Sequence, residues 1–409
     1  MKLIHTSDWH LGRSLYGRKR FDEFEQFLDW LLEVIRESQA QALLVSGDVF
    51  DTGTPSNRAQ ELYYRFLGQA SRTGCRHVVI TAGNHDSPTF LDAPKTMLRY
   101  QNVYVVGRID EDPSNEALVL KDDKGRPELI VCAVPYLRDR DVRLAEAGES
   151  MDDKAQKMLA GIEEHYKRVC GAAKAVRDGL DQPVPIVAMG HLFTAGGRTD
   201  KEDGVRELYV GGLGQVRPEI FPEEIDYLAL GHLHIPQKVR GRDHFRYPGS
   251  PLPMSFKESE QNKMVLEVEF AGTQPQVREL RTPCFRELRR IRGGHDELVQ
   301  AVTNLKDQGS QAWLELEYTG ETGAGILLDK VKSLIEGTGM EVVRTNDLTT
   351  ALRILNRETP LETLNELSEE EVFTRRLEAG DVPDSQRKEL MDAFKEILAD
   401  LHERDARAE

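Results

Sequence analysis

Short apolar runs that alternate with helix-periodic stretches dominate the first 270 residues of the chain. Runs of a few Val, Ile and Leu residues are typical of buried β-strands, and apolar residues that recur every three or four positions are typical of amphipathic helices. This alternation predicts a layered α/β domain with a largely buried sheet. The predicted strands are Lys2–Thr6, Ala42–Ser46, Val78–Thr81, Val103–Val106, Ile130–Val134, Ile186–Met189 and Tyr227–Leu230, and the predicted helices span 21–35, 59–71 and 153–169.

The pattern changes after about Pro283. Strands at 313–318 and 341–344, with helices near 296–306 and 327–336, are enough for a small α+β module. Thr359 and Pro360 then interrupt the chain, and a pair of amphipathic, acidic helices follows at about 369–401, with a capping box at Ser368 and a stop at Gly380. We therefore expect three parts, with bounds at 1–280, 281–355 and 356–409.

Composition excludes several classes of protein. The four cysteines form no CxxC pair, so neither a disulfide framework nor a zinc ribbon is indicated. No apolar run approaches the roughly 18 residues of a membrane span, and the first residues form a strand rather than a signal peptide, so we expect a cytoplasmic protein. The net charge is -16, and the 17 acidic and 9 basic residues of 346–409 contribute half of it. Such a charge disfavours a protein that holds DNA by its overall charge alone. A local basic patch, metal ions or a partner subunit could still supply the attraction.

Five motifs of potential metal ligands each follow the end of a predicted strand. In an open α/β sheet, the loops after the carboxyl ends of the strands converge on one crevice. Residues two apart on an extended segment point the same way, so the members of each DxH or HxH pair can share a site. The candidate ligands are Asp8, His10, Asp48, Asn84, His191, His232 and His234, with His85 as an additional imidazole.

Seven ligands are too many for one cation and suit two, with Asp48 shared between them. Mixed oxygen and imidazole ligands favour Mn²⁺, Fe²⁺ or Zn²⁺ over Ca²⁺. A pair of such cations can clamp a phosphoester for in-line attack by a bridging hydroxide. Any single Gly-Asp or Gly-His pair is ordinary turn chemistry, and a lone histidine there is more often structural. The ordered set of five motifs indicates a metal-dependent phosphoesterase.

The motifs resemble those of the calcineurin-like metallophosphoesterases. The segments HTSDWHLG, SGDVFDTG, TAGNHDS, GHLHIPQ and YPGSPLPMSF are similar to the SbcD family of bacterial nuclease subunits. The resemblance implies a layered α/β/β/α domain, a small α+β capping domain and a C-terminal helical hairpin. It also implies two Mn²⁺ ions, or Mg²⁺ or Fe²⁺ in their place. The first would be bound by Asp8, His10, Asp48 and His234, and the second by Asp48, Asn84, His191 and His232, with His85 beside the scissile phosphate.

The same resemblance implies the activity and the partners. The expected enzyme is a DNA nuclease with 3′-to-5′ exonuclease and single-strand or hairpin endonuclease action, used in DNA replication, recombination and repair near the nucleoid. ATP would gate it through the coiled-coil ATPase subunit SbcC, held by the C-terminal helices in a heterotetramer around a homodimer of the nuclease domain. Two alternatives remain open: a phosphodiesterase for nucleotides or small phosphoesters, and a non-catalytic tether of DNA ends with structural metals.

Two further features concern the surroundings of the site. Asp51 lies three residues after Asp48, and we hypothesise that it orients His85 and keeps it protonated; the alternative is a turn or cap carboxylate. Thr52 and the sequence GNHD differ from the GDxxDRG and GNHE of phosphoprotein phosphatases, so that class is disfavoured. A basic loop next to the first ligands is expected to contact DNA, unless it is a solvated loop that caps the following helix. Its candidate residues are Arg13, Tyr16, Arg18, Lys19 and Arg20.

Overall fold

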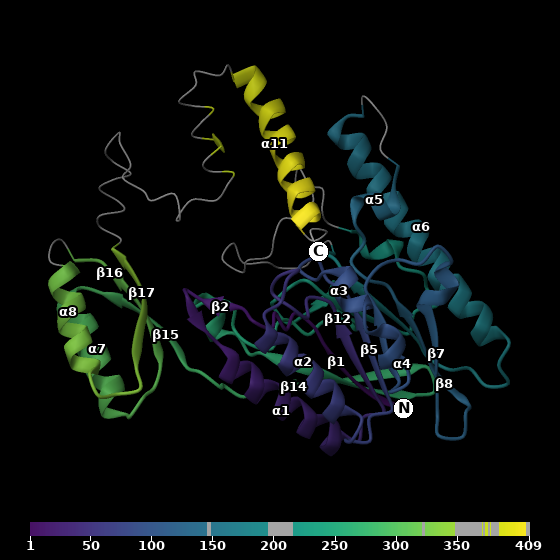
Figure 1. Ribbon diagram of the computed structural model, residues 1–409, viewed down its shortest axis with the longest axis horizontal. Helices are drawn as coiled ribbons and strands as arrows, with labels where there is room; N and C mark the ends of the chain where they lie inside the picture. The colour runs from purple at the N-terminus through teal and green to yellow at the C-terminus, as the bar shows by residue number, and fades with distance from the viewer. Residues whose placement is uncertain are drawn as a thin grey trace.

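The computed structural model describes most of the chain (Figure 1). The described residues are 1–144, 149–194, 216–320, 324–347, Glu370, Phe373, Thr374, Leu377 and 384–405. The glycine-rich loop at 196–206, the predicted capping box at Ser368 and the predicted helix stop at Gly380 lie outside them.

Two six-stranded sheets form the larger body of the protein. The first has the order β14-β13-β1-β4-β5-β6, and its β1, β4, β5 and β6 run parallel. The second has the order β11-β12-β10-β9-β8-β7, with β8, β9, β10 and β12 parallel. The strands of the first sheet are β1 (Lys2–Thr6), β4 (Ala42–Ser46), β5 (His77–Thr81), β6 (Val103–Val106), β13 (Met264–Ala271) and β14 (Gln274–Arg281). Those of the second are β7 (Ala117–Lys121), β8 (Pro127–Ala133), β9 (Ile186–His191), β10 (Tyr227–Gly231), β11 (Gln237–Val239) and β12 (Arg242–Tyr247).

The sheets pack face to face, and helices cover their outer faces. One buried cluster, with Leu44, Val79, Val131 and Met189, lies between the sheets and draws side chains from both. A second cluster joins the first sheet to α1 (Phe21–Ser38) and α2 (Asn57–Ala70), and a third joins the second sheet to α6 (Met151–Asp178). The central strands β4, β5, β9 and β10 are buried along their whole length, as continuous apolar runs require. The architecture is therefore the α/β/β/α sandwich that the family resemblance implies, and it contains the layered α/β domain that the apolar pattern predicts.

Short elements complete this body. Ser56 caps α2 by accepting from the Ala59 N–H, and Ser150 with Asp153 forms a capping box at the start of α6. The remaining elements are β2 (Ser14–Leu15), β3 (Arg18–Lys19), α3 (Pro88–Asp92), α4 (Lys95–Arg99), α5 (Asp139–Val142) and the 3₁₀ helices Pro113–Glu116, Pro218–Ile220 and Lys257–Glu260.

All seven strands predicted for this body are present, and the structure adds others that the apolar runs do not reveal. Strand β12 has the sequence RDHFRY and β14 has QPQVRELR, both largely polar. Such strands lie at or near sheet edges, where one face is exposed and few apolar residues are needed. Hydrophobic periodicity therefore detects the central strands and misses the peripheral ones.

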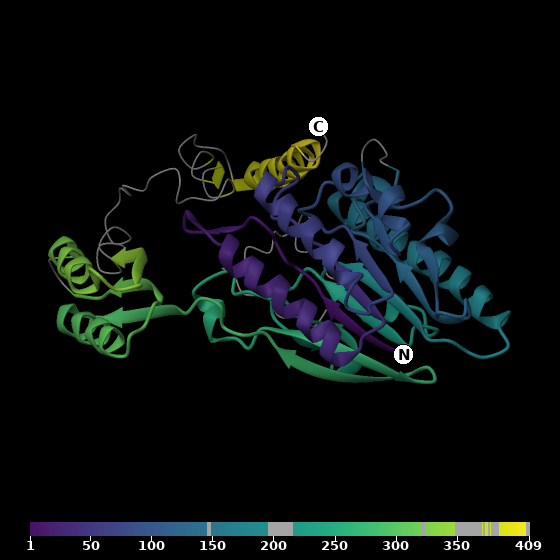
Figure 2. The ribbon, with the colours of Figure 1, turned by 60° about the horizontal axis from the view of Figure 1, so that its bottom comes forward.

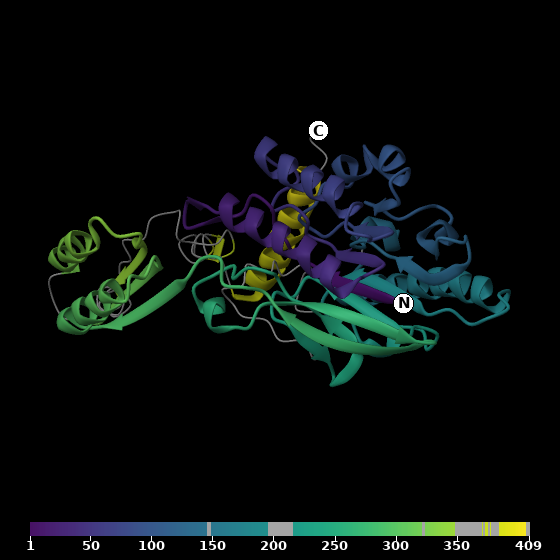
Figure 3. The same cartoon turned by 90° about the horizontal axis from the view of Figure 1, so that it is seen from below.

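A smaller body follows the β13–β14 hairpin (Figures 2 and 3). It contains a parallel three-stranded sheet with the order β15-β16-β17, and both of its helices pack on one shared core. Its elements are β15 (Leu288–Gly293), α7 (His295–Asp307), β16 (Trp313–Tyr318), α8 (Ala324–Ile335) and β17 (Glu341–Asp347). We call residues 288–347 the small module. The predicted bounds of the three parts stay predictions.

The small module contacts the larger body through a separate apolar cluster. Leu288 and Trp313 of the module pack with Leu15 and Phe256 of the larger body. The Tyr16 ring stacks on Phe256 at 5.8 Å between centroids. Arg344 donates to the Tyr16 hydroxyl at 2.8 Å, and Arg18 pairs with Glu341 at 2.5 Å.

The C-terminal part contains a long helix, α11 (Asp384–Asp405). Phe394 stacks on Phe373 at 4.0 Å, and Lys395 pairs with Glu370, so part of a second helical segment lies beside α11. Glu396 also pairs with Lys154 of α6 at 2.5 Å. None of the helices in the described part of the chain combines the length and hydropathy that crossing a membrane requires.

Candidate metal centre

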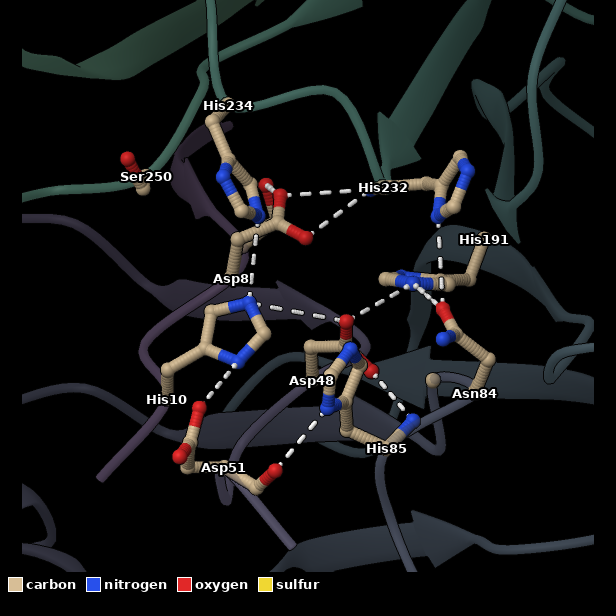
Figure 4. Close-up of polar contacts among 12 residues, drawn as sticks. Asp8, His10, Asp48, Asp51, Asn84, His85, His191, His232, His234 and Ser250 are labelled. Carbon is tan, nitrogen blue, oxygen red and sulfur yellow. Dashed lines mark hydrogen bonds and ion pairs between the residues drawn. The ribbon is translucent and has the colours of Figure 1, made fainter. Parts of the chain in front are cut away.

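The seven candidate ligands lie together at the carboxyl ends of parallel strands from both sheets (Figure 4). Asp8 and His10 follow β1, Asp48 follows β4 and Asn84 follows β5. In the facing sheet, His191 ends β9, while His232 and His234 follow β10. Six of the seven are buried, and Asn84 is half-buried. Residues up to 226 positions apart in the sequence thus surround one small volume.

One cluster of ligand atoms forms around Asp8, His10 and His234. Their ligand atoms lie within 4.8 Å of one another. The Nε2 atoms of His10 and His234 face each other at 3.2 Å, and His10 Nε2 lies 3.6 Å from Asp48 Oδ2. The Asp8 carboxylate accepts from the His232 N–H at 3.0 Å, which fixes its direction.

A second cluster lies on the other side of Asp48. His191 Nε2 is 3.3 Å from Asp48 Oδ2 and 3.0 Å from Asn84 Oδ1. His232 Nδ1 lies 3.3 Å from the same Asn84 oxygen. The other ring nitrogen of His191, Nδ1, donates to the Ser46 carbonyl at 2.9 Å, so Nε2 is the nitrogen that faces the site and can bind a cation. Asp48 therefore lies between the two clusters.

The arrangement fits divalent cations. Nitrogen and oxygen atoms of His10, His234, Asn84 and Asp48 converge in a buried volume, and positive charge among them stabilises this arrangement. Burial lowers the pKa of His191, but the Asp48 carboxylate outweighs this effect and raises the pKa to about 9. Burial likewise lowers the pKa of His10, and the carboxylates of Asp51 and Asp48 outweigh it and raise the pKa. The carboxylate charge that raises the pKa values of His10 and His191 also stabilises metal cations.

Four of the candidate ligands have left-handed backbone conformations that side-chain-bearing residues rarely adopt. The φ angles of Asp8, His10 and Asp48 are 52°, 47° and 49°, and that of His232 is 99°. Hydrogen bonds between neighbouring loops hold this backbone, with the Asp8 N–H donating to Gly47 O and the His10 N–H to Asp48 O. Strain of this kind persists only where the surrounding structure enforces it, and it is concentrated at functional sites.

Two glycines of the motifs are required by close packing. A Cβ at Gly83 would lie 2.1 Å from Asp48 Oδ1, and one at Gly231 would lie 1.8 Å from the Ser46 carbonyl oxygen. Both clashes involve the loops that carry the ligands. The glycines therefore allow the loops from different strands to approach within bonding distance of a shared cation.

His85 is half-buried at the edge of the site, and its contact with Asp51 differs from the hypothesis. His85 Nδ1 donates to the main-chain carbonyl of Asp51 at 2.9 Å. The Asp51 carboxylate instead faces His10 Nδ1 at 3.4 Å and accepts from Arg13 at 3.2 Å. The hydrogen bond that orients His85 thus comes from the Asp51 main chain, while the Asp51 carboxylate lies within 4.8 Å of ring nitrogens of both His10 and His85, so its proposed effect on His85 stays a prediction.

Two buried carboxylates near the site were missed by sequence reasoning. Asp86 accepts from the N–H groups of Val49, Phe50 and Gly83, and so ties the β4 loop to the β5 loop. Its pKa is raised to about 6 because burial and the nearby Asp48 charge outweigh those bonds. Asp86 is the last residue of the GNHD motif, and its place in that motif was the sequence signal that could have identified it. Glu258 lies behind His234 in a stretch without periodicity, where no signal was available.

The structure assigns different environments to the five residues of the predicted DNA-binding loop. Arg20 is buried, bonded to both Glu23 oxygens and to the Pro253 carbonyl, so its prediction as a DNA contact is wrong. Tyr16 and Arg18 contact the small module, and Arg13 contacts Asp51. Lys19 is exposed. Two of the five residues therefore contact the small module, and a DNA contact by the others that remain accessible stays a prediction.

Comparison with known proteins identifies the family of the chain. The family model described as calcineurin-like phosphoesterase matches residues 1–236, and the one described as type 5 capsule protein repressor C-terminal domain matches 284–380. The chain is 37% identical over 404 residues to the SbcD subunit of the SbcCD nuclease of Escherichia coli K12, covering 98% of each chain. It is 31% identical to the SbcD subunit from Bacillus subtilis, covering 78% of each. A dimetal phosphatase structure from Danio rerio aligns with a TM-score of 0.38 and 9% identity, covering 69% of this chain and 96% of that one.

Proposed function

This chain belongs to the calcineurin-like phosphoesterases and, within them, to the family of SbcD subunits of SbcCD nucleases, and from that premise we propose that it hydrolyses DNA phosphodiester bonds at the buried ligand cluster described above. The observation that carries the proposal is the convergence of seven ligands from five loops and two sheets. The substrate is DNA ends, hairpins and single strands, cut by 3′-to-5′ exonuclease and by endonuclease action.

We assign Asp8, His10, Asp48 and His234 to one cation and Asp48, Asn84, His191 and His232 to the other. Manganese suits this mixture of oxygen and imidazole ligands, with Mg²⁺ and Fe²⁺ as substitutes. When bound, such a pair supplies charge neutralisation for the phosphate and an activated water. The buried carboxylates and imidazoles of the chain exclude bulk water from this position and hold the ligands in fixed directions.

His85 moves a proton in the proposed reaction. A carbonyl oxygen can only accept, so the bond to Asp51 O requires the proton on Nδ1. The titrating nitrogen is then Nε2, and a protonated Nε2 can stabilise the scissile phosphate or protonate the leaving oxygen. The His85 main-chain N–H donates to Asp48 Oδ1 at 2.9 Å, which ties this residue to the shared ligand.

We further propose that the chain works with SbcC, the ATPase subunit of the complex named for these relatives, which gates cleavage with ATP. The binding segment is the C-terminal helical part, where Leu390 and Ile397 of α11 are 41% and 58% exposed. Large apolar residues seven positions apart on a charged helix suit a helical partner.

Exposed Met97 and Tyr100, at and just beyond α4, would contribute to a homodimer within a heterotetramer. A role in replication, recombination and repair would place the protein at the nucleoid.

A phosphodiesterase for nucleotides or small phosphoesters is the second candidate function. The same ligand cluster would serve it. The small module counts against it, because residues of the loop next to the first ligands, Tyr16 and Arg18, are used to hold that module. An enzyme for a small substrate has no need of such an attachment.

The test uses the purified chain, Mn²⁺, an end-labelled DNA hairpin and bis-p-nitrophenyl phosphate. We expect both substrates to be cleaved, or the hairpin only after SbcC and ATP are added. His85→Gln should lower either rate by about 10²–10⁴-fold, the usual contribution of a positioned acid–base group. His295→Gln, which changes a partly exposed histidine of α7, serves as the matched control. Hydrolysis of the small ester alone, even with SbcC and ATP, would favour the second function.

A further inference from the structure

A buried ion pair lies directly behind the candidate ligand His234. Glu258 is fully buried, and its Oε2 accepts from Lys263 Nζ and from the Met254 N–H. Lys263 Nζ also donates to the His234 carbonyl at 3.0 Å and to Ser250 Oγ at 3.0 Å. The Lys263 charge compensates that of Glu258, so the pair can remain ionised without solvent.

The second oxygen of Glu258 faces the His234 ring. Glu258 Oε1 lies 3.7 Å from His234 Nδ1, and among the described residues neither atom has a hydrogen-bond partner although both are buried. His234 Nε2, at the opposite side of the ring, points toward His10 (Figure 4). An imidazole that binds a cation through Nε2 carries its proton on Nδ1, and a carboxylate is the usual acceptor for that proton.

The same segment forms part of the contact with the small module. Phe256, two residues before Glu258, is buried against Leu288 and Trp313 of the module and stacks on Tyr16. The 3₁₀ helix Lys257–Glu260 begins at the next residue and contains Glu258. One short stretch therefore contacts the module through Phe256 and faces the metal centre through Glu258.

We propose that Glu258 is a positioning residue for His234, and that docking of the small module on Phe256 holds Glu258 in place. The proposal rests on the assignment of His234 as a metal ligand in the proposed function. Displacement of the module would move Phe256 and, through the short main chain between residues 256 and 258, the carboxylate that fixes the His234 ring. The affinity of one of the two cation positions then depends on how the module is seated.

The first test measures Mn²⁺ binding to the metal-free full-length chain by isothermal titration calorimetry. We expect two binding events for the unmodified chain, and for Glu258→Gln a loss of about 10–100-fold in affinity at one event only, as for other carboxylates behind metal-bound histidines. Glu116→Gln is the matched control, because Glu116 is equally buried and bonds His165 Nε2 at 2.8 Å. No binding by the unmodified chain would contradict the proposed function, whereas equal binding by Glu258→Gln would overturn only the positioning role.

A second variant separates positioning from misfolding. Glu258→Gln leaves Lys263 buried without its full countercharge, so the double variant Glu258→Gln/Lys263→Met removes both charges. We expect the double variant to unfold, without metal, closer to the temperature of the unmodified chain and to retain the weakened Mn²⁺ event. Recovery of normal Mn²⁺ binding in the double variant would overturn the positioning role.

A third variant tests the link to the small module. Trp313→Ala removes a docking contact without changing the larger body, and we expect it to weaken the same Mn²⁺ event by a smaller factor. Val299→Ala, which truncates an apolar side chain in the module's own core, is the control and should bind Mn²⁺ normally. If Trp313→Ala also binds normally, the link between docking and the metal centre is wrong.

Discussion

Individual side chains at the site are held in directions that cost free energy. Non-glycine residues with left-handed backbone cost on the order of 1–3 kcal/mol each, and four candidate ligands are of this kind. Buried hydrogen bonds from neighbouring loops enforce these conformations, so each ligand depends on partners far away in sequence. Substitutions around the ligands should therefore affect metal binding as much as stability.

Asp51→Asn should leave the action of His85 intact. The carbonyl that orients His85 belongs to the main chain, whereas the lost charge bonds His10 and Arg13 and only lies near His85. At saturating Mn²⁺ we expect the limb of the pH–rate profile that reports His85 to be retained, and we expect the Mn²⁺ requirement to rise by up to about tenfold. Rates measured against pH and against Mn²⁺ concentration check this, with the exposed Asp112→Asn as control. Loss of the limb of the profile that reports His85, with an unchanged Mn²⁺ requirement, would restore the role of the carboxylate.

His5 should make stability depend on pH. This residue is buried between the sheets and bonded to Tyr227 and Ser46, and burial, with a smaller effect of Arg246, lowers its pKa to about 3. Below about pH 6.5, His5 is therefore protonated in the unfolded chain but not in the folded chain. The contribution of neutral His5 to the free energy of unfolding is complete above pH 6.5 and is lost as the pH falls toward 3.

The expected slope from His5 is about 1.4 kcal/mol per pH unit below 6.5. Urea unfolding followed by tryptophan fluorescence between pH 7.5 and 5.0 measures it. His5→Gln should be less stable than the unmodified chain at pH 7.5 and should lose less stability on acidification. Parallel pH dependence of the two proteins would show that His5 does not titrate as described.

At the scale of the elements, the site depends chiefly on how closely the ligand-bearing loops approach one another. The parallel strands that carry the ligands have their carboxyl ends close together, and Gly83 and Gly231 let the loops after them pack without a Cβ in between. The edge strands and the outer helices lie away from these carboxyl ends. Loops after β1, β4, β5, β9 and β10 are thus constrained far more tightly than the surface of α6.

Gly83→Ala and Gly171→Ala should have opposite effects. A Cβ at residue 83 meets the side chain and the backbone nitrogen of Asp48, so we expect a loss of about 1–3 kcal/mol from overpacking, together with weaker Mn²⁺ binding. Residue 171 lies on an exposed face of α6 with open space around it, so alanine should add about 0.5–1 kcal/mol. Urea unfolding and calorimetry measure both changes. A neutral Gly83→Ala would mean that the β4 and β5 loops move apart easily.

The larger body, the small module and the C-terminal helical part have different roles in the proposed function. The first contains the candidate metal centre, and the second has its own core but shares a contact cluster with the first. The ion pair between Arg18 and Glu341 is exposed and contributes little, so apolar packing around Phe256 carries most of the docking. The third part presents apolar residues to the surroundings.

Removal of the chain from residue 360 onward should retain hydrolysis of small phosphodiesters and abolish association with SbcC. Ile397→Asp in the full chain should weaken association in the same direction, because it places a charge on the exposed apolar face of α11. Ile397→Val keeps that face apolar and is the control. Pull-down and analytical ultracentrifugation give the readout. Tight association of the truncated chain would place the SbcC contact elsewhere.

The central strands, the three main outer helices and the candidate ligands could be read from the sequence because each is encoded locally. An apolar run defines a buried strand, and a ligand motif that is contiguous with such a run lies at its end. Convergence of the motifs then follows from the parallel arrangement of the strands. The roles of the individual ligands and of His85 stay predictions.

Other features depend on contacts that no local pattern encodes. The burial of Arg20, the turn of the Asp51 carboxylate toward His10 and the position of Glu258 behind His234 each depend on segments that meet only in the folded chain. Hydrophobic periodicity reports which side of an element is apolar. It does not report which polar group lies opposite that element, nor the direction in which a side chain points. Local encoding therefore specifies the strands and their ligands, whereas long-range packing specifies how those ligands are oriented and what holds them.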